Sequence, residues 1–290
     1  MRIRKWLKNN TSSLCGKTIA ISGSTGGIGR ELCFYFAELG ASLVLLDRNM
    51  QKSFALAEII RKKYPSTSIS HIQVDMSDIS IVKAAADNLS ELDIDFLVLN
   101  AGAYSIPRCR CDTGYDNVFQ INFVSPYYLA RRLLPNIRER GGRIIAVGSI
   151  AHNYSLSDID DVDFSKRSRA SLVYGNAKRY LMFSLQAISK TPNDVIIAHP
   201  GITPTNITKH YPKLIYAIIK YPMKLIFMPP RKASLSILAA LFIDCDKEEW
   251  IGPKYFDIWG LPKRKKLQTC KEKEREQICD VAERIYSDLE

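Results

Sequence analysis

Tyr174 and Lys178 stand four residues apart, a phenol and an amine within a segment of helical periodicity. On a helix, such positions lie one turn apart on the same face. A lysine ammonium placed there favours the phenolate and so lowers the pKa of the tyrosine. The pair could therefore pass a proton to or from a substrate oxygen near neutral pH. The spacing alone is weak evidence, because solvated helix faces carry such pairs by chance.

A glycine-rich turn spans residues 23–29, after a short β-branched run at 17–22 and before a helical pattern at 30–39. Its spacing is G-x-x-x-G-x-G, with Gly23, Gly27 and Gly29 as the motif glycines. A turn of this kind between a strand and a helix lets the backbone approach a pyrophosphate, which the helix N-terminus then faces. The turn therefore predicts a dinucleotide phosphate site.

Asp47 ends the next apolar run, 18 residues after Gly29, where an acid commonly meets the adenosine ribose hydroxyls. An aspartate there favours NAD because it repels a 2′-phosphate, whereas the adjacent Arg48 could favour NADP. The residue before Gly27 is Gly26, whereas a basic residue there would favour NADP. NAD is therefore the preferred expectation and NADP the alternative. The structural alternative for Asp47 is a cap on the following helix.

Strand and helix patterns alternate along the chain. Strands are expected at 17–22, 42–46, 68–74, 95–99, 143–147, 194–198 and 254–258. Helices are expected at 30–39, 50–64, 77–89, 174–189, 231–243 and 268–289, with Ser77 available to cap the third. This order predicts an α/β fold: a Rossmann-type, doubly wound, seven-stranded and mostly parallel sheet with helices on both faces. We expect one domain over residues 1–290.

Two polar residues occupy positions where this architecture places chemistry. Ser149 follows the expected strand 143–147, and ligands of such sheets bind at the carboxyl ends of the strands. Asn122 interrupts the apolar and aromatic segment 114–139, where a buried amide needs hydrogen-bond partners. For Asn122 alone, a structural role is the plainer interpretation. The polar stretch 151–172 is expected to be a loop insertion.

In order and approximate spacing, these motifs resemble the short-chain dehydrogenase/reductase family over roughly residues 15–262. The resemblance rests on the glycine turn, Asn100-Ala-Gly102, Asn122, Ser149, Tyr174-x-x-x-Lys178 and the segment from Pro200-Gly201 to Thr205. The stretch between Ser149 and Tyr174, and the tail from Pro230 to Phe256, are similar to the retinol-dehydrogenase-like branch.

The resemblance implies roles by position. Tyr174 would be the acid/base, Ser149 would bind the substrate oxygen, Lys178 would hold the nicotinamide ribose, and Asn122 would hold a relay water. The residues implied to contact the cofactor are Gly23, Ser24, Gly27, Ile28, Gly29, Asp47, Arg48, Asp75, Met76, Asn100, Ala101, Gly102, Tyr174, Lys178, Pro200, Gly201, Ile202 and Thr205.

The function implied is NAD(P)-dependent hydride transfer at the alcohol or carbonyl carbon of a retinoid-, steroid- or lipid-like substrate. Two alternatives stay open. One is a non-catalytic, cofactor-sensing or scaffold protein, which would be expected to have lost the four residues Asn122, Ser149, Tyr174 and Lys178. The other is a carbon–carbon double-bond reductase on the same frame. The resemblance also implies homodimers or homotetramers through the helices equivalent to 114–139 and 174–189.

The net charge of +11 is concentrated in three stretches that contain no acid: 1–14, 209–232 and 263–266. No nucleic-acid-binding motif accompanies these basic stretches. An anionic membrane surface, contacted peripherally, is therefore the preferred partner. Solvated surface charge without a partner is the alternative. The seven cysteines and four histidines show no metal-ligand spacing, so no metal site is expected. Single thiols and a basic-polar start without a signal peptide favour a cytoplasmic protein.

Residues 209–228 occupy the place of the family's substrate lid. Their apolar runs are too short for a membrane span. Lys213, Lys220 and Lys224 share one helical face, and Pro222 divides the segment. We expect a lid that lies on a membrane surface, with an amphipathic helix packed on the body as the alternative.

Overall fold

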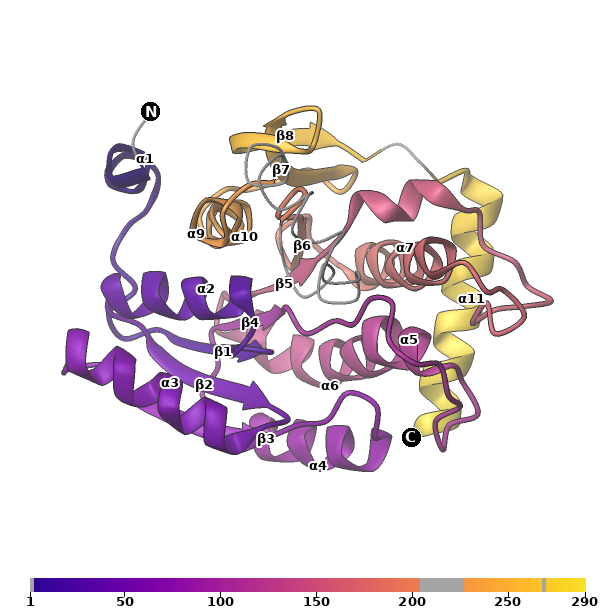
Figure 1. Ribbon diagram of the computed structural model, residues 1–290, viewed down its shortest axis with the longest axis horizontal. Helices are drawn as coiled ribbons and strands as arrows, with labels where there is room; N and C mark the ends of the chain where they lie inside the picture. Colours follow the sequence, from indigo (N-terminus) through magenta and orange to yellow (C-terminus); the bar gives the residue numbers. More distant parts are fainter. Residues whose placement is uncertain (1–2, 204–226, 268–269) are drawn as a thin grey trace, which may run out of the picture.

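Among the residues that the structure describes, a single sheet of eight strands organises the fold (Figure 1). The computed structural model describes residues 3–203, 227–267 and 270–290. The strand order is β3-β2-β1-β4-β5-β6-β7-β8, all parallel except that β7 and β8 form an antiparallel pair. The strands are β1 Thr18–Ser22, β2 Ser42–Asp47, β3 Ile69–Gln73, β4 Phe96–Leu99, β5 Arg143–Val147, β6 Val195–Ala198, β7 Glu249–Tyr255 and β8 Trp259–Lys266. The doubly wound α/β prediction is confirmed.

The predicted count of seven strands is wrong. The expected strand 254–258 is the turn region of a hairpin whose arms are β7 and β8. The second arm carries Lys263, Arg264, Lys265 and Lys266, the third of the basic stretches that contain no acid. Lysines suit an edge strand, because they discourage pairing with another chain. The basic run and the strand are therefore the same segment.

Helices cover both faces of the sheet (Figure 1). They are α1 Ile3–Asn10, α2 Gly27–Glu38, α3 Met50–Lys63, α4 Ile79–Ser90, α5 Asn117–Phe119, the π-helix η1 Gln120–Val124, α6 Ser125–Glu139, the 3₁₀ helix η2 Ile150–Tyr154, α7 Ala170–Ile188, α9 Pro230–Ala233, α10 Leu235–Ala239 and α11 Glu272–Leu289. Asp78 caps α4 by accepting from the amides of Ser80 and Ile81, so the expected cap at Ser77 is wrong. Ser77 instead donates to Asp75. Asn49, not Asp47, caps α3.

Side chains of the central strands alternate between two apolar cores. On β5, Ile144 and Ala146 enter the core that includes α4, α6, α7 and α11, while Ile145 and Val147 enter the core that includes α1, α2, α3 and α10. Both faces are covered, which explains why the strands are nearly continuous apolar runs. Within the ranges that the structure describes, no helix is long and apolar enough to cross a membrane.

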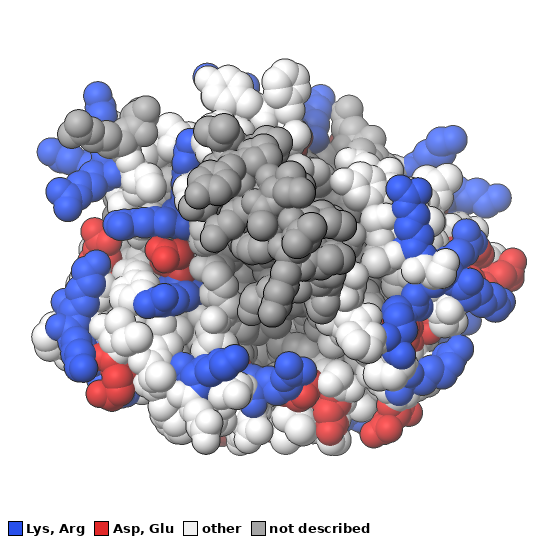
Figure 2. All heavy atoms as spheres, in the orientation of Figure 1, with Lys and Arg blue, Asp and Glu red and all other residues white. Residues whose placement is uncertain are grey.

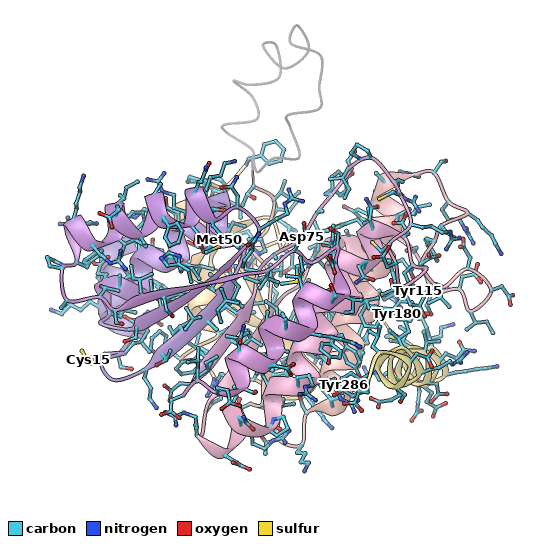
Figure 3. The ribbon with its side chains drawn as sticks, turned by 90° about the horizontal axis from the view of Figure 1, so that it is seen from below. Cys15, Met50, Asp75, Tyr115, Tyr180 and Tyr286 are labelled. Carbon is cyan, nitrogen blue, oxygen red and sulfur yellow. The ribbon has the colours of Figure 1, made fainter. Side chains whose placement is uncertain are left out.

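The C-terminal helix α11 lies within the segment 268–289, where a helix was expected, and packs against α7. Its residues Ile278, Ala282 and Ile285 are buried in the first core. Tyr286, labelled in Figure 3, packs against the ring of Tyr128 on α6. At the other terminus, Trp6 anchors α1 in the second core. Both ends of the described chain are therefore fastened to the sheet layers.

Candidate active site

The glycine turn is compact because side chains do not fit in it. Gly23 has φ +67°, a conformation that L side chains rarely adopt. A Cβ on Gly29 would collide with the carbonyl oxygen of Gly23. No side chain caps the first turn of α2, which begins at Gly27. Backbone amides at this helix start are thus suited to bind a phosphate.

Asn100 ties the end of β4 to the end of β1. Its Nδ2 donates to the carbonyl oxygens of Ser22 and Gly23, both at 3.0 Å. The hydroxyl of Ser22 in turn accepts from the amides of Asn100 and Ala101, both at 3.0 Å. Sequence reasoning missed Ser22, although a serine ending a buried strand just before the glycine turn was a usable signal. The network positions the loop that would flank the middle of a dinucleotide.

Asp47 does not face an open site in the structure. Its carboxylate accepts from the hydroxyls of Ser24 and Ser53 on Oδ2, and from the amide and hydroxyl of Thr25 on Oδ1. The residue is 2% exposed. These four donors match the roughly four lone-pair positions of a carboxylate. Asp47 therefore stabilises the glycine turn through its hydrogen bonds to Ser24 and Thr25.

Arg48 is the exposed cation at the same strand end. Its side chain is 74% exposed, and its Nε lies 3.9 Å from Asp75 Oδ2. Asp75, labelled in Figure 3, follows β3 closely and accepts from the amide and hydroxyl of Ser77. Met76 is buried beside it, and its carbonyl accepts from Ser125. The structure thus brings Arg48 and Asp75 together at the expected adenosine end.

The side chain of Asn122 is fully buried in η1 and is held by backbone groups. Its Nδ2 donates to the carbonyls of Ala103 and Val118, both at 2.8 Å, and its Oδ1 accepts from the Ala103 amide at 3.2 Å. Gly102 passes so close that a Cβ there would lie 2.8 Å from the amide oxygen. Asn122 therefore braces the 100–103 loop, which is the structural role that its burial suggested.

Ser149, Tyr174 and Lys178 converge at the carboxyl end of β5. Ser149 lies close enough to the Tyr174 hydroxyl to lower its pKa. The Nζ of Lys178 lies 5.8 Å from the centroid of the Tyr174 ring and donates to the Val147 carbonyl at 2.9 Å. Lys178 is 2% exposed, whereas Tyr174 is only partly buried. The arrangement places two hydroxyl donors side by side, with an amine one helical turn away.

Burial dominates the electrostatics of this trio. It raises the pKa of Tyr174 to about 12, while the Ser149 hydrogen bond lowers it by less and the nearby Tyr104 raises it further. The expected lowered pKa of Tyr174 is wrong for this structure, because desolvation of the phenolate outweighs the groups that favour it. Burial also lowers the pKa of Lys178, to about 8. Tyr174 is consequently a protonated donor at neutral pH.

The segment after β6 forms the other wall of the site. Gly201 has φ +77°, and its amide donates to Nδ1 of His199 at 3.2 Å. Ile202 accepts at its carbonyl from the Met228 amide. Thr205 and the lid expected at 209–228, apart from residues 227 and 228, lie outside the described residues.

Apolar side chains pack against Tyr174. Val118, Phe164 and Val173 form a small buried cluster, and Ile106, Leu172 and Tyr174 pack against it. The ring of Tyr104 meets that of Tyr174 edge-on at 5.3 Å. Sequence reasoning missed this wall, because Tyr104, Ile106, Phe164 and Leu172 come from stretches to which no strand or helix was assigned.

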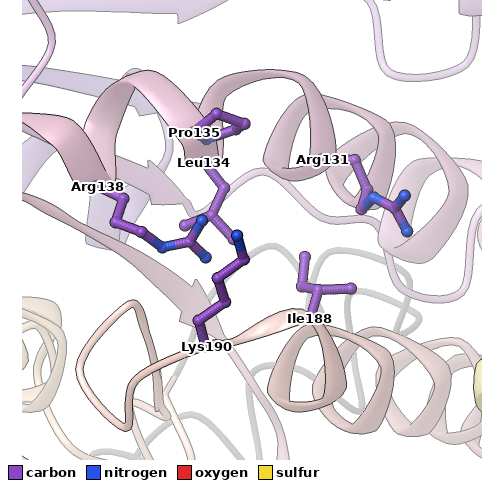
Figure 4. Close-up of a pocket in the computed structure, with 6 residues that line it drawn as sticks. All are labelled: Arg131, Leu134, Pro135, Arg138, Ile188 and Lys190. Atoms are coloured by element: carbon purple, nitrogen blue, oxygen red, sulfur yellow. The ribbon is translucent and has the colours of Figure 1, made fainter.

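A separate cavity of about 330 Å³ lies between α6 and the end of α7 (Figure 4). It is lined by Arg131, Leu134, Pro135, Arg138, Ile188 and Lys190, and none of these is a candidate site residue. Arg138 pairs with Asp194, so this surface needs no ligand to balance that charge. Across the described ranges, no group of three or more His, Cys, Asp or Glu side chains could hold a metal ion.

Comparisons with known proteins agree on one family. Residues 17–160 match the family model described as short chain dehydrogenase. An uncharacterized oxidoreductase of Schizosaccharomyces pombe is 28% identical over 88% of this chain and 80% of its own length. Human retinol dehydrogenase 13 is 25% identical over 69% of this chain and 62% of its own length.

A solved short-chain dehydrogenase from Sphingobium yanoikuyae in complex with NADPH has a similar fold, with a TM-score of 0.59. The match covers 77% of this chain and 82% of that one, at 22% identity. This likeness shows the fold alone.

Proposed function

The chain belongs to the short-chain dehydrogenase/reductase family of NAD(P)-dependent oxidoreductases, and from that premise we propose that it transfers a hydride between nicotinamide and a hydrophobic alcohol or carbonyl. The observation that supports this most is the convergence of Ser149, Tyr174 and the buried amine of Lys178 at the carboxyl end of β5. When bound, the nicotinamide supplies or accepts the hydride itself.

The residues of the chain supply the proton and stabilise charge. As a carbonyl is reduced, negative charge builds on its oxygen, and donors aimed at that oxygen lower the barrier. Tyr174, protonated at neutral pH, donates the proton, and Ser149 donates a hydrogen bond to the same oxygen. Lys178 would bind the ribose hydroxyls, where its positive charge also favours the phenolate that remains after proton transfer.

The apolar wall beside Tyr174 supports a hydrophobic substrate. Tyr104, Ile106 and Leu172 are all partly buried next to the acid/base and offer no charge to a polar substrate. The name of the human relative refers to retinol, an alcohol of the apolar kind that such a wall would accept. Apolar burial of this kind contributes about 25 cal/mol per Å² of covered surface.

A substrate panel tests the proposal directly. Purified protein is mixed with NADH or NADPH and with retinoid, steroid, long-chain and short hydrophilic carbonyls, and cofactor oxidation is followed by absorbance. We expect turnover with the apolar carbonyls and an alcohol product. Cofactor binding without turnover on any member would favour the non-catalytic alternative, and a saturated carbon–carbon product would favour the double-bond reductase.

We propose NADP(H) as the cofactor, although the sequence pattern favoured NAD. The carboxylate of Asp47 is already occupied by four donors from Ser24, Thr25 and Ser53, so it offers no lone pair to a ribose hydroxyl. Arg48, by contrast, is exposed at the same strand end and suited to a 2′-phosphate.

Replacing Arg48 with alanine is therefore expected to raise the KM for NADPH by about 10- to 100-fold, the usual effect of losing a charged hydrogen bond. The KM for NADH should change less than about twofold, since NADH has no 2′-phosphate. Lys62→Ala, an exposed charge at the far end of α3, is the matched control. An equal change in both KM values would contradict the assignment.

The homodimer implied by resemblance is also a proposal, and it needs a surface other than the one that α11 occupies. That helix packs on α7, one of the two helices through which association was expected. An interface would therefore have to use the parts of α6 and α7 that α11 leaves uncovered.

A further inference from the structure

The hairpin of β7 and β8 ends in a turn with an unusual conformation. Phe256 and Asp257 both have positive φ, +52° and +57°, and the Ile258 amide donates to the Tyr255 carbonyl at 3.0 Å. Two-residue turns of this shape normally contain glycine or asparagine, because bulky L residues rarely adopt left-handed φ. A phenylalanine held there calls for a functional explanation.

The turn is fastened from its polar side. Oδ1 of Asp257 lies 3.0 Å from Nε2 of the buried His199 and 2.7 Å from Nζ of Lys265. Lys265 also donates to the Pro253 carbonyl at 2.7 Å. These bonds anchor Asp257 to the segment that leads into Gly201. The conformation of the tip is therefore built into the fold.

The apolar side of the same turn points into solvent. Phe256 is 90% exposed and Tyr255 is 53% exposed. Phe256 has the largest exposed fraction of the large hydrophobic residues in the described ranges. An aromatic ring held outward in a strained conformation gains no packing energy within the chain. We therefore expect the Phe256 ring to contact an apolar surface, and not water, in the functional state of the protein.

Basic side chains surround these aromatics. Lys254 and Lys263 are exposed, and the Nζ of Lys232 lies 4.4 Å from the Trp259 ring centroid. A cavity of about 270 Å³ opens here, lined by Lys232, Lys254, Tyr255, Trp259, Gly260 and Leu261. The two acids of the hairpin are already paired, Asp257 with Lys265 and Glu249 with Arg264. In Figure 2, the upper edge of the face, where Figure 1 places β7 and β8, shows white side chains with a few basic ones beside them.

We propose that the tip of the β7–β8 hairpin docks on an anionic lipid surface. Phe256 and Tyr255 enter the boundary between head groups and acyl chains, and Lys232, Lys254 and Lys263 meet lipid phosphates. Aromatic rings at that depth beside lysines at the phosphate level are the chemistry of interfacial anchors. A soluble anion would use the lysines but leave Phe256 exposed.

The location of the tip gives this docking a consequence. Gly201 packs so tightly on the hairpin that a Cβ there would lie 2.6 Å from the Ile258 carbonyl oxygen. The anchored turn and the segment after β6 are thus neighbours. Docking would turn the segment after β6 toward the membrane. The docking proposal itself does not depend on the proposed hydride transfer.

Vesicle co-sedimentation of the full chain tests the proposal. We expect binding to phosphatidylcholine vesicles that contain phosphatidylserine, and much weaker binding to phosphatidylcholine alone. Phe256→Asp should weaken binding by about tenfold or more. The fold should tolerate it, because aspartate accepts a left-handed φ. Lys254→Gln and Lys263→Gln should each weaken binding by about fivefold.

Ile59→Asp is the matched control. It adds the same charge at an exposed apolar position of α3, which contacts β2 and β3 near the opposite edge of the sheet. Its binding should equal wild type, and thermal melting should show all variants folded. Quenching of Trp259 emission by brominated lipid, with Trp6 and Trp250 buried, reports insertion independently.

Three results would overturn the proposal. The first is wild-type protein that does not bind the phosphatidylserine vesicles. The second is Phe256→Asp that binds as wild type does, since binding would then belong to another segment. The third is an Ile59→Asp loss as large as the Phe256→Asp loss, since added negative charge alone would then explain both. A binding assay of this kind is unaffected by whether the protein turns over any substrate.

Discussion

Replacing Tyr174 with phenylalanine is expected to reduce turnover by about 100- to 10,000-fold, the usual contribution of a positioned proton donor. The ring and its apolar contacts remain, so cofactor affinity should change less than about twofold. At neutral pH the wild-type phenol is protonated, because burial raises its pKa to about 12. The variant therefore lacks the phenol proton that would be donated, while the ring and its apolar contacts are retained. Steady-state rates and NADPH fluorescence titration measure the two quantities.

Tyr180→Phe provides the matched control on the same helix. Tyr180, labelled in Figure 3, is fully buried, and its hydroxyl has no hydrogen-bond partner in the part of the chain that the structure describes. Removing that hydroxyl should leave both turnover and stability near wild type. Turnover retained by Tyr174→Phe, or lost equally in both variants, would contradict the assignment of Tyr174 as the acid/base.

Replacing Glu274 with alanine is expected to destabilise the protein by about 3–5 kcal/mol, because it leaves a buried arginine without its counter-ion. The Arg179 side chain is 1% exposed, and its Nε and Nη2 donate to the two carboxylate oxygens of Glu274, each at 2.6 Å. Its Nη1 donates to the His152 carbonyl at 3.0 Å. The pair thus fastens α11 to α7 and to the loop after Ser149. Urea unfolding followed by circular dichroism measures the loss.

The exposed Glu276, two residues further along α11, is the control, and Glu276→Ala should change stability by less than about 0.5 kcal/mol. Lowering the pH provides a second test of the Arg179–Glu274 pair. Burial raises the pKa of Glu274, but hydrogen bonds from Arg179 and Ser157 outweigh it, so the net pKa is lowered. The stability that this pair contributes is present above the unfolded-state pKa of Glu274 and is lost as pH falls through the lower folded-state value. The gap between wild type and Glu274→Ala should shrink on acidification. A loss below about 1 kcal/mol would show that the pair is not a stabilising contact. A constant gap would show that its contribution does not depend on the ionised carboxylate.

The same α11 contact shows where sequence patterns stop being informative. Charge alternation predicted an amphipathic helix near 268–289, yet nothing in that pattern indicates which surface its apolar side covers. The partner of Glu274 is Arg179, 95 positions earlier in the chain. Only the folded chain brings these two charges into a buried pair.

The sequence by itself determined the strand–turn–helix frame and the candidate residues at the ends of its strands. Those features are local: apolar periodicity, the glycines that close approach requires at Gly23 and Gly29, and a four-residue spacing that puts Tyr174 and Lys178 on one helical face. The tertiary structure decided how the side chains are used. It turned Asp47 inward onto Ser24, Thr25 and Ser53, made an edge strand of the basic run at 263–266, and raised the pKa of Tyr174 where proximity to Lys178 had suggested the reverse. Burial and hydrogen-bond saturation depend on segments distant in the chain, and for that reason no local pattern could reveal them.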